Sequence, residues 1–163
     1  MTQRLLDLTG IGRERLHLEW LSSAEAQRFA DIAHNTVATV KSLGPLDHDA
    51  FSLQLEAAQL TVDNEAVRWI VGKEISITTR GDVYGRSWDE EKYEKVLDEA
   101  LEREYHNNLI ILAMKDGLSS VREISEKTGI AVLRISYLLA DLERVGRAEF
   151  RGMTDSTASF AAL

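Results

Sequence analysis

The sequence offers few side chains that could hold a metal ion or a redox centre. It contains no cysteine, which excludes a disulfide framework, a thiolate nucleophile, and zinc or iron–sulfur centres bound by cysteine. The four histidines lack the spacing of metal ligands: His17, His34, His48 and His106. His48 stands between Asp47 and Asp49, a pattern typical of a polar helix start. We therefore expect no metal or cofactor to be bound by this chain.

Carboxylate groups are abundant, but their pattern does not indicate catalysis. They cluster at Asp89 to Glu91 and again at Asp98 to Glu102, and Lys92 and Lys95 lie at helical spacing from them. This mixture is typical of a solvated helix face. The sequence has no Gly-x-Ser-x-Gly motif for a nucleophilic serine. We expect no catalytic residue.

One group of basic residues near glycines could bind phosphate. Arg68, Lys73 and Arg80 precede or adjoin Gly81 and Gly85. The glycine spacing fits neither a dinucleotide-binding fingerprint nor a P-loop. A structural turn is therefore the favoured interpretation of this stretch.

Composition is that of a soluble globular protein. Of the 163 residues, 44% are hydrophobic and 28% are charged, enough for one ordinary core or two small ones. The sequence has no apolar run of membrane-spanning length and no secretory signal at its start, so we expect a cytoplasmic protein without membrane contact. The net charge of −8 disfavours non-specific binding to nucleic acid. We interpret Trp20, Trp69 and Trp88 as core or interface anchors.

The first of three predicted domains spans residues 1–45 and ends at the only proline of the chain. We predict a helix from Thr2 to Leu8 and a half-buried strand from Arg15 to Trp20, where polar and apolar residues alternate. A second helix should begin at Ser22 or Ser23 and stop at Gly44. So short a unit cannot bury its own core.

The predicted strand has no partner within residues 1–45, and an unpaired strand leaves main-chain donors and acceptors free. We therefore expect another polypeptide to pair with it. The alternative is pairing with a second predicted strand of this chain, Ile75 to Thr79. The expected partner interface combines the apolar residues of the strand with those of the helix that follows: Leu16, Leu18, Trp20, Phe29, Ile32 and Val37.

The second predicted domain, residues 46–104, is a helical connecting region with one short strand. We expect the following elements in order: a helix from Asp47 or Asp49, a helix capped by Asp63 or Asn64, the strand Ile75 to Thr79, a turn from Arg80 to Gly85, and a long acidic helix opened by Ser87 or Asp89.

The third predicted domain, residues 105–163, has the element order of a winged helix-turn-helix. Gly117 ends a first helix, Ser119 or Ser120 caps a second, and the third runs from Ala131 to Val145. Two short strands, Ala148 to Phe150 and Ala158 to Ala161, would form the wing around Thr154-Asp155-Ser156. This fold serves both DNA readers and protein adaptors.

The charge of this domain disfavours DNA binding. Basic and acidic residues nearly cancel between Ser119 and Arg151, whereas DNA readers present several uncompensated cations. If the domain does bind nucleic acid, the candidate contacts are Arg134, Arg144, Arg147 and Arg151.

Two runs carry a resemblance to a known family: RLLDLTGIGRERLHLEW from Arg4 to Trp20, and LSSAEAQRFADIAHNTVATVKSLGP from Leu21 to Pro45. They resemble the C-terminal end of the delta subunit of methyl-viologen-reducing hydrogenases, an iron–sulfur subunit that works beside heterodisulfide reductase. The runs LQLEAAQL, RWIVGKE and GDVYG between Leu53 and Gly85 look like an extension in longer members.

The resemblance implies that residues 1–45 are a fragment of a flavodoxin-like α/β layer, attached to a mainly α chain with short β elements. The cysteine-bearing half of that family is missing here. Iron–sulfur clusters and FAD are therefore expected in partner subunits rather than in this chain. The implied setting is anaerobic electron transfer in the cytoplasm.

Two functions follow from the sequence. The first is a non-catalytic docking subunit of a hydrogenase-type or heterodisulfide-reductase-type complex, in which iron–sulfur and flavin subunits are the partners of a hetero-oligomer. The second is a winged-helix transcriptional regulator that binds DNA.

Overall fold

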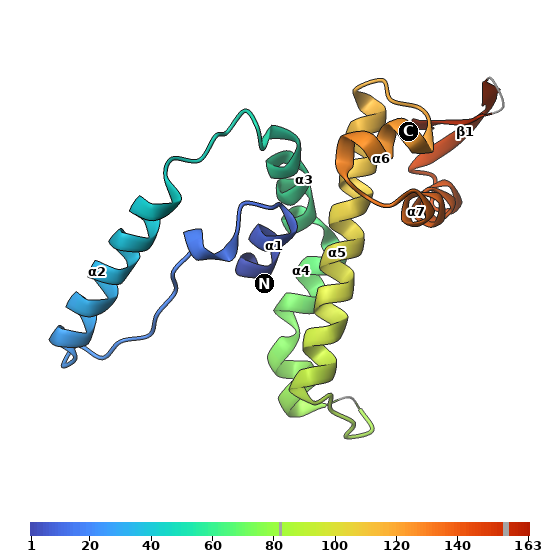
Figure 1. Cartoon of the computed structure of the whole chain (residues 1–163). Coiled ribbons are helices and arrows are strands. Elements are labelled where there is room, and N and C mark those ends of the chain that lie inside the picture. Colours follow the sequence, from blue (N-terminus) through green and yellow to red (C-terminus); the bar gives the residue numbers. More distant parts are fainter. Residues whose placement is uncertain (82, 155–156) are drawn as a thin grey trace. The chain divides into compact units, whose positions relative to one another are not determined.

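The computed structural model describes residues 1–81, 83–154 and 157–163. These residues form a mainly helical structure with a small antiparallel sheet of two strands (Figure 1). The chain divides into two compact units, Met1–Ser52 and Leu53–Leu163. Asp82 of the predicted turn, and Asp155 and Ser156 of the predicted wing, lie outside the described residues.

The first unit contains α1 (Thr2–Leu8), a 3-10 turn η1 (Arg13–Arg15) and α2 (Ala26–Leu43). The predicted bounds of α1 are confirmed, and α2 ends where the sequence predicts, at Gly44. After α1 the Thr9 hydroxyl donates a hydrogen bond to the Leu6 carbonyl at 2.8 Å. The main chain then turns through Gly12, whose φ of 89° favours glycine.

The start of α2 differs from the prediction. Its N-cap residue is Glu25 rather than Ser22 or Ser23, and no side chain caps the helix. Instead, the Ser22 amide donates to the Glu25 carboxylate at 2.7 Å, and Glu25 also accepts from Arg28 at 3.1 Å. The serine lies too far ahead of the helix to cap it, so it closes the preceding turn.

The second unit begins with three helical elements: α3 (Ser52–Asp63), α4 (Glu65–Gly72) and the π-helical turn η2 (Ser76–Arg80). The expected start of α3 at Asp47 or Asp49 is wrong. Asp47 accepts from the amides of Asp49 and Ala50 at 3.1 Å, which forms a turn instead of a helix. The predicted cap of α4 is confirmed, since Asn64 accepts from the amides of Ala66 and Val67.

The strand predicted at Ile75 to Thr79 is wrong, because these residues are helical. The β-branched side chains favour a strand, but the Thr78 hydroxyl donates to the Glu74 carbonyl at 2.8 Å, a bond that fits a helix. The Gly81 amide closes the wide turn on the Ser76 carbonyl at 3.0 Å. The alternative pairing partner of the Arg15–Trp20 segment is therefore not a strand.

The long helix α5 (Glu90–Lys115) supplies most of the core of the second unit (Figure 1). Asp89 caps it, as predicted, by accepting from the Lys92 amide at 2.7 Å. Leu101 and Ile110 on this helix are fully buried. The helix runs without a break through residues 104 and 105, between which the second and third predicted domains were divided.

After α5 come α6 (Val121–Thr128), α7 (Val132–Arg144) and a hairpin of β1 (Ala148–Thr154) and β2 (Thr157–Ala162). Ser120 and Glu123 form a capping box at the start of α6, and Gly129 turns the chain at a φ of 74°. Both predicted strands form, but β1 extends beyond the predicted end at Phe150 to Thr154, and β2 is one residue longer at each end than predicted. Ile124 of α6 and Ile135 of α7 are fully buried, so these helices share a core with α5.

Candidate partner interface

An extended segment of the first unit lacks main-chain partners. The strand predicted from Arg15 to Trp20 does not form as a paired strand in the described chain. Leu16 has the φ of −118° and ψ of 113° of extended backbone. Within the residues that the structure describes, no hydrogen bond is formed by the main-chain groups of His17 to Leu21. These groups are available to water or to another chain.

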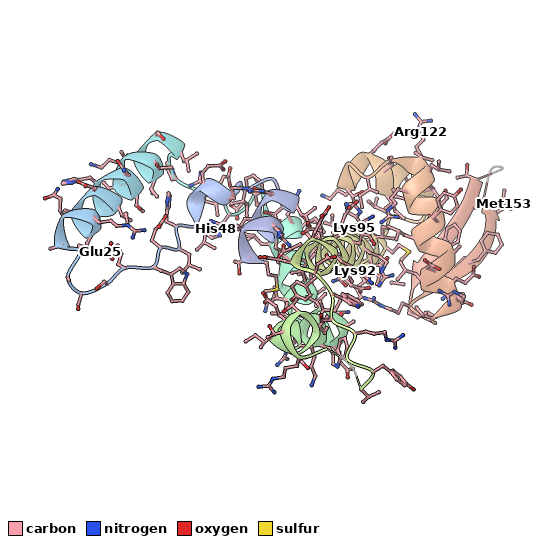
Figure 2. The ribbon with its side chains drawn as sticks, turned by 90° about the horizontal axis from the view of Figure 1, so that it is seen from below. Glu25, His48, Lys92, Lys95, Arg122 and Met153 are labelled. Carbon is pink, nitrogen blue, oxygen red and sulfur yellow. The ribbon has the colours of Figure 1, made fainter. Side chains whose placement is uncertain are left out.

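Side-chain hydrogen bonds fix both ends of this segment. At its start, Gln3 donates to the Leu16 carbonyl at 3.0 Å. The Arg15 guanidinium donates to the carbonyls of Leu43 and Gly44 at the end of α2. At its far end, Glu25 holds the Ser22 amide (Figure 2). The segment is therefore anchored at two points and unpaired between them.

The side chains of the segment are more exposed than an isolated fold would favour. Leu18 is 70% exposed and Trp20 is 82% exposed, whereas Leu16 is half-buried. An indole buries a large apolar area when it is packed. The interpretation of Trp20 as a core residue is therefore wrong, and its interpretation as an interface residue stays a prediction.

The helix α2 has no buried residue. Phe29 is 63% exposed and Val37 is 53% exposed, while Ile32 is half-buried. Val40 and Leu43 continue the same apolar face and are exposed as well. Val40 and Leu43 follow Val37 at intervals of three residues, as expected for one helix face, but the predicted interface did not include these two residues.

A hollow of about 380 Å³ joins the extended segment to the first turn of α2. Leu21 and Phe29 line it on the apolar side, and Ser22 and Glu25 line it on the polar side. The Ser22 amide, followed by Arg28, holds the pKa of the Glu25 carboxyl below its usual value. Glu25 is thus charged at neutral pH and already has hydrogen-bond partners. The hollow therefore combines apolar side chains with a carboxylate whose hydrogen bonds are made, as protein interfaces often do.

The arginines proposed as nucleic-acid contacts are mostly paired with acids. Arg144 pairs with Asp141 and Arg151 with Glu149, both at 3.0 Å. Arg134 lies on α7. Whether these four residues contact nucleic acid stays a prediction.

Arg147, which directly precedes β1, belongs to a polar network with residues of α3, of α5 and of the N-cap of α4. Its guanidinium donates to Asn108 at 3.0 Å and to Glu104 at 3.4 Å. Asn108 donates to Thr61 of α3, and Asn64 donates to Glu104, both at 3.1 Å. The network holds Arg147 against α5 rather than presenting it as a free cation.

The first turns of α7 expose three apolar side chains, where a DNA-reading helix usually presents polar ones. Val132, Leu133 and Tyr137 are 53%, 67% and 65% exposed. Leu133 is therefore exposed, whereas the buried residues of α7 are Ile135, Leu138, Leu139 and Leu142. This exposed surface is better suited to a protein than to phosphates.

Burial shifts the pKa values of two titratable groups on α5, Tyr105 and His106. Burial lowers the pKa of His106, although Glu102 opposes this shift, and burial raises the pKa of Tyr105 to about 12. Both side chains are uncharged at neutral pH.

In the described part of the chain, no three His, Asp or Glu residues gather to hold a metal ion. Among the described helices, none has the length and apolar character needed to cross a membrane.

A comparison with known protein families gives a match within the first unit. The family model of the methyl-viologen-reducing hydrogenase delta subunit matches residues 1–44. The match runs from α1 to the end of α2, so it covers both the unpaired segment and the exposed helix. No solved structure matches the chain. The N-terminal part of the chain is therefore similar to a subunit of hydrogenase-type complexes.

Proposed function

We propose that the chain is a non-catalytic docking subunit of a cytoplasmic, hydrogenase-type or heterodisulfide-reductase-type electron-transfer complex. One observation carries the proposal: the main-chain groups from His17 to Leu21 have no partner in the described structure, and they lie in the segment similar to the hydrogenase delta subunit. The partners would be subunits that hold iron–sulfur clusters and FAD, since this chain has no cysteine.

The docking mechanism would be completion of a partner's sheet. Residues His17 to Leu21 would add as an edge strand, so that main-chain hydrogen bonds supply affinity and alternate side chains supply specificity. In the flavodoxin-like layer suggested by the resemblance, α2 would then cover the added strand. Trp20, Phe29 and Val37 would become buried anchors, and truncating any one of them would weaken the binding free energy by about 2 kcal/mol.

The proposal is tested by affinity purification of the full chain from native extract, followed by mass spectrometry for iron–sulfur and flavin subunits. A Phe29→Ser/Val37→Ser double variant should lose these subunits, whereas Ala38→Ser, which changes the neighbouring exposed position on α2, should retain them. Equal recovery with both variants would contradict a role for the apolar face of α2.

A second function, a DNA-binding regulator, has one observation in its favour: the order of α6, α7 and the β1–β2 hairpin suits a winged helix. In that case residues 105–163 would bind DNA through the four candidate contacts, Arg134, Arg144, Arg147 and Arg151. Retention on heparin or duplex DNA that weakens steeply with salt would favour this function over docking. The apolar exposed side of α7 favours a protein surface as the target instead.

A further inference from the structure

The second unit contains a cleft of about 640 Å³ between the end of α4, the turn η2 and the start of α5. Two tryptophans and three basic residues contribute to its lining: Trp69, Trp88, Lys73, Arg86 and Lys92. This volume is typical of sites for small molecules. The residues that line the cleft all belong to the second unit, whereas the docking proposal rests on residues of the first unit.

The main chain around the cleft is fixed by a tight reversal. The Trp88 amide donates to the Ile77 carbonyl at 3.0 Å, which brings the start of α5 back to η2. Gly81 has a φ of 74°, and a Cβ atom there would lie 2.9 Å from the Arg86 carbonyl oxygen. The reversal therefore requires glycine, and it brings together basic residues that are far apart in the sequence.

The lining of the cleft is positively charged in an acidic protein. Among the residues that the structure describes, Lys73, Arg86 and Lys92 contribute to the lining and no carboxylate does, although the chain carries a net charge of −8. Lys73 and Lys92 form no ion pair with any described residue. The Lys92 ammonium lies 4.8 Å from the centre of the Trp88 ring, which orients this cation without neutralising it.

The cleft also offers a surface for a flat ring. Trp69 is 58% exposed although it is the largest side chain of α4. Exposed indoles beside cations are the elements with which proteins stack bases and hold phosphates. In the sequence, Arg68, Lys73 and Arg80 form a group of basic residues that could bind phosphate, although the nearby glycines fit no known phosphate-loop motif. Of these three residues, only Lys73 is among the described residues that line the cleft.

We propose that this cleft binds a nucleotide, with the aromatic base on the indoles of Trp69 and Trp88 and the phosphates on Lys73 and Lys92. A small ligand fits better than a nucleic-acid strand. Asp89, Glu90 and Glu91 begin α5 next to the cleft, and Glu74 follows Lys73 in the sequence. These carboxylates would repel a long polyanion on either side of the site.

Isothermal titration calorimetry of the full chain with ADP, adenosine and pyrophosphate tests this inference. ADP should bind, and adenosine and pyrophosphate should each bind at least about tenfold more weakly, because each offers only one of the two contacts. Absence of ADP binding would overturn the proposal. Pyrophosphate binding as tight as that of ADP would also overturn it, because the ring would then contribute nothing.

Charge-matched variants locate the site. Lys73→Gln and Lys92→Gln should each weaken ADP binding by about tenfold, while Lys95→Gln should leave it unchanged, since Lys95 lies on the same helix but outside the lining (Figure 2). Trp69→Leu should weaken ADP more than pyrophosphate. Circular dichroism would verify that each variant keeps its helix content. Equal losses for Lys92→Gln and Lys95→Gln would show only general charge attraction and would refute the site.

Discussion

The Arg15 guanidinium donates to the Gly44 carbonyl at 2.9 Å, which joins the start of the unpaired segment to the end of α2. A second bond reaches the Leu43 carbonyl at 3.2 Å. The last carbonyls of a helix have no partner within it, so a cation there satisfies them and interacts favourably with the helix dipole. Since α2 has no buried residue, we expect this polar contact to help hold its C-terminal end against the segment.

Replacing Arg15 with glutamine should loosen the end of α2. We expect faster amide hydrogen exchange near the C-terminus of α2, with no change in α5, because local opening reports local contacts. Lys41→Gln is the matched control, since Lys41 is the basic residue in the last turn of α2 and is exposed. Similar exchange in both variants would show that the Arg15 contact does not hold the helix.

Exposed apolar residues of the first unit should be dispensable for folding. Trp20→Ser should change the free energy of unfolding by no more than about 0.5 kcal/mol, as substitutions of exposed side chains usually do. Within an assembled complex, the same change should weaken binding by about 2 kcal/mol, a roughly thirtyfold rise in Kd. Denaturant unfolding of the isolated chain provides the first value. A large loss of stability there would show that Trp20 packs within its own chain.

The network around Glu104 should be sensitive to loss of Arg147. The Glu104 side chain is 12% exposed, so Arg147→Met should leave a buried acceptor with fewer partners and destabilise the chain by about 1–3 kcal/mol. The control is Arg144→Met. Its exposed pair with Asp141 is expected to contribute about 0–1 kcal/mol. Thermal unfolding would compare the two variants, and equal midpoints would show that the network adds no stability.

The capping box of α6 should make stability depend on pH. The amide and hydroxyl of Ser120 and the amide of Ser119 hold the pKa of Glu123 below its usual value of 4.5. A carboxyl with a lowered pKa in the folded state stabilises the fold fully above its unfolded pKa. That stabilisation is lost as pH falls through the folded value.

Thermal unfolding between pH 7 and pH 3 tests this dependence. Wild type should be more stable than Glu123→Gln at neutral pH, and the difference should shrink as pH falls below about 4.5. Ser120→Ala should cost about 1 kcal/mol through loss of the cap. A difference that stays constant across this pH range would show that the Glu123 charge does not contribute.

Most helices could be predicted because their signals are local. Asn64, Asp89 and Ser120 each accept an amide hydrogen bond at the helix start that their residue type favours. The segment from Ile75 to Thr79 could not be predicted, since its β-branched residues have no strand to pair with and a helical hydrogen bond of Thr78 decides its form. Strand formation depends on a neighbour, and sequence alone does not reveal whether one exists.

The candidate interface was partly predictable for the same reason. Apolar spacing identified one face of α2, and the lack of a second strand within residues 1–45 indicated that the main chain of the Arg15–Trp20 segment is unpaired. The side-chain hydrogen bonds that anchor both ends of this segment became visible only in the structure. The cleft at Lys73 and Lys92 was not predictable, because these residues are brought together by the reversal at Gly81. That reversal carries no known motif.

Amide hydrogen exchange at His17 to Leu21 tests the central claim most directly, measured on the isolated chain and on the complex purified from native extract. We expect fast exchange in the isolated chain, because these amides have no partner, and strong protection in a complex that contains iron–sulfur or flavin subunits. Protection in the isolated monomer, or fast exchange at these amides within the complex, would contradict it.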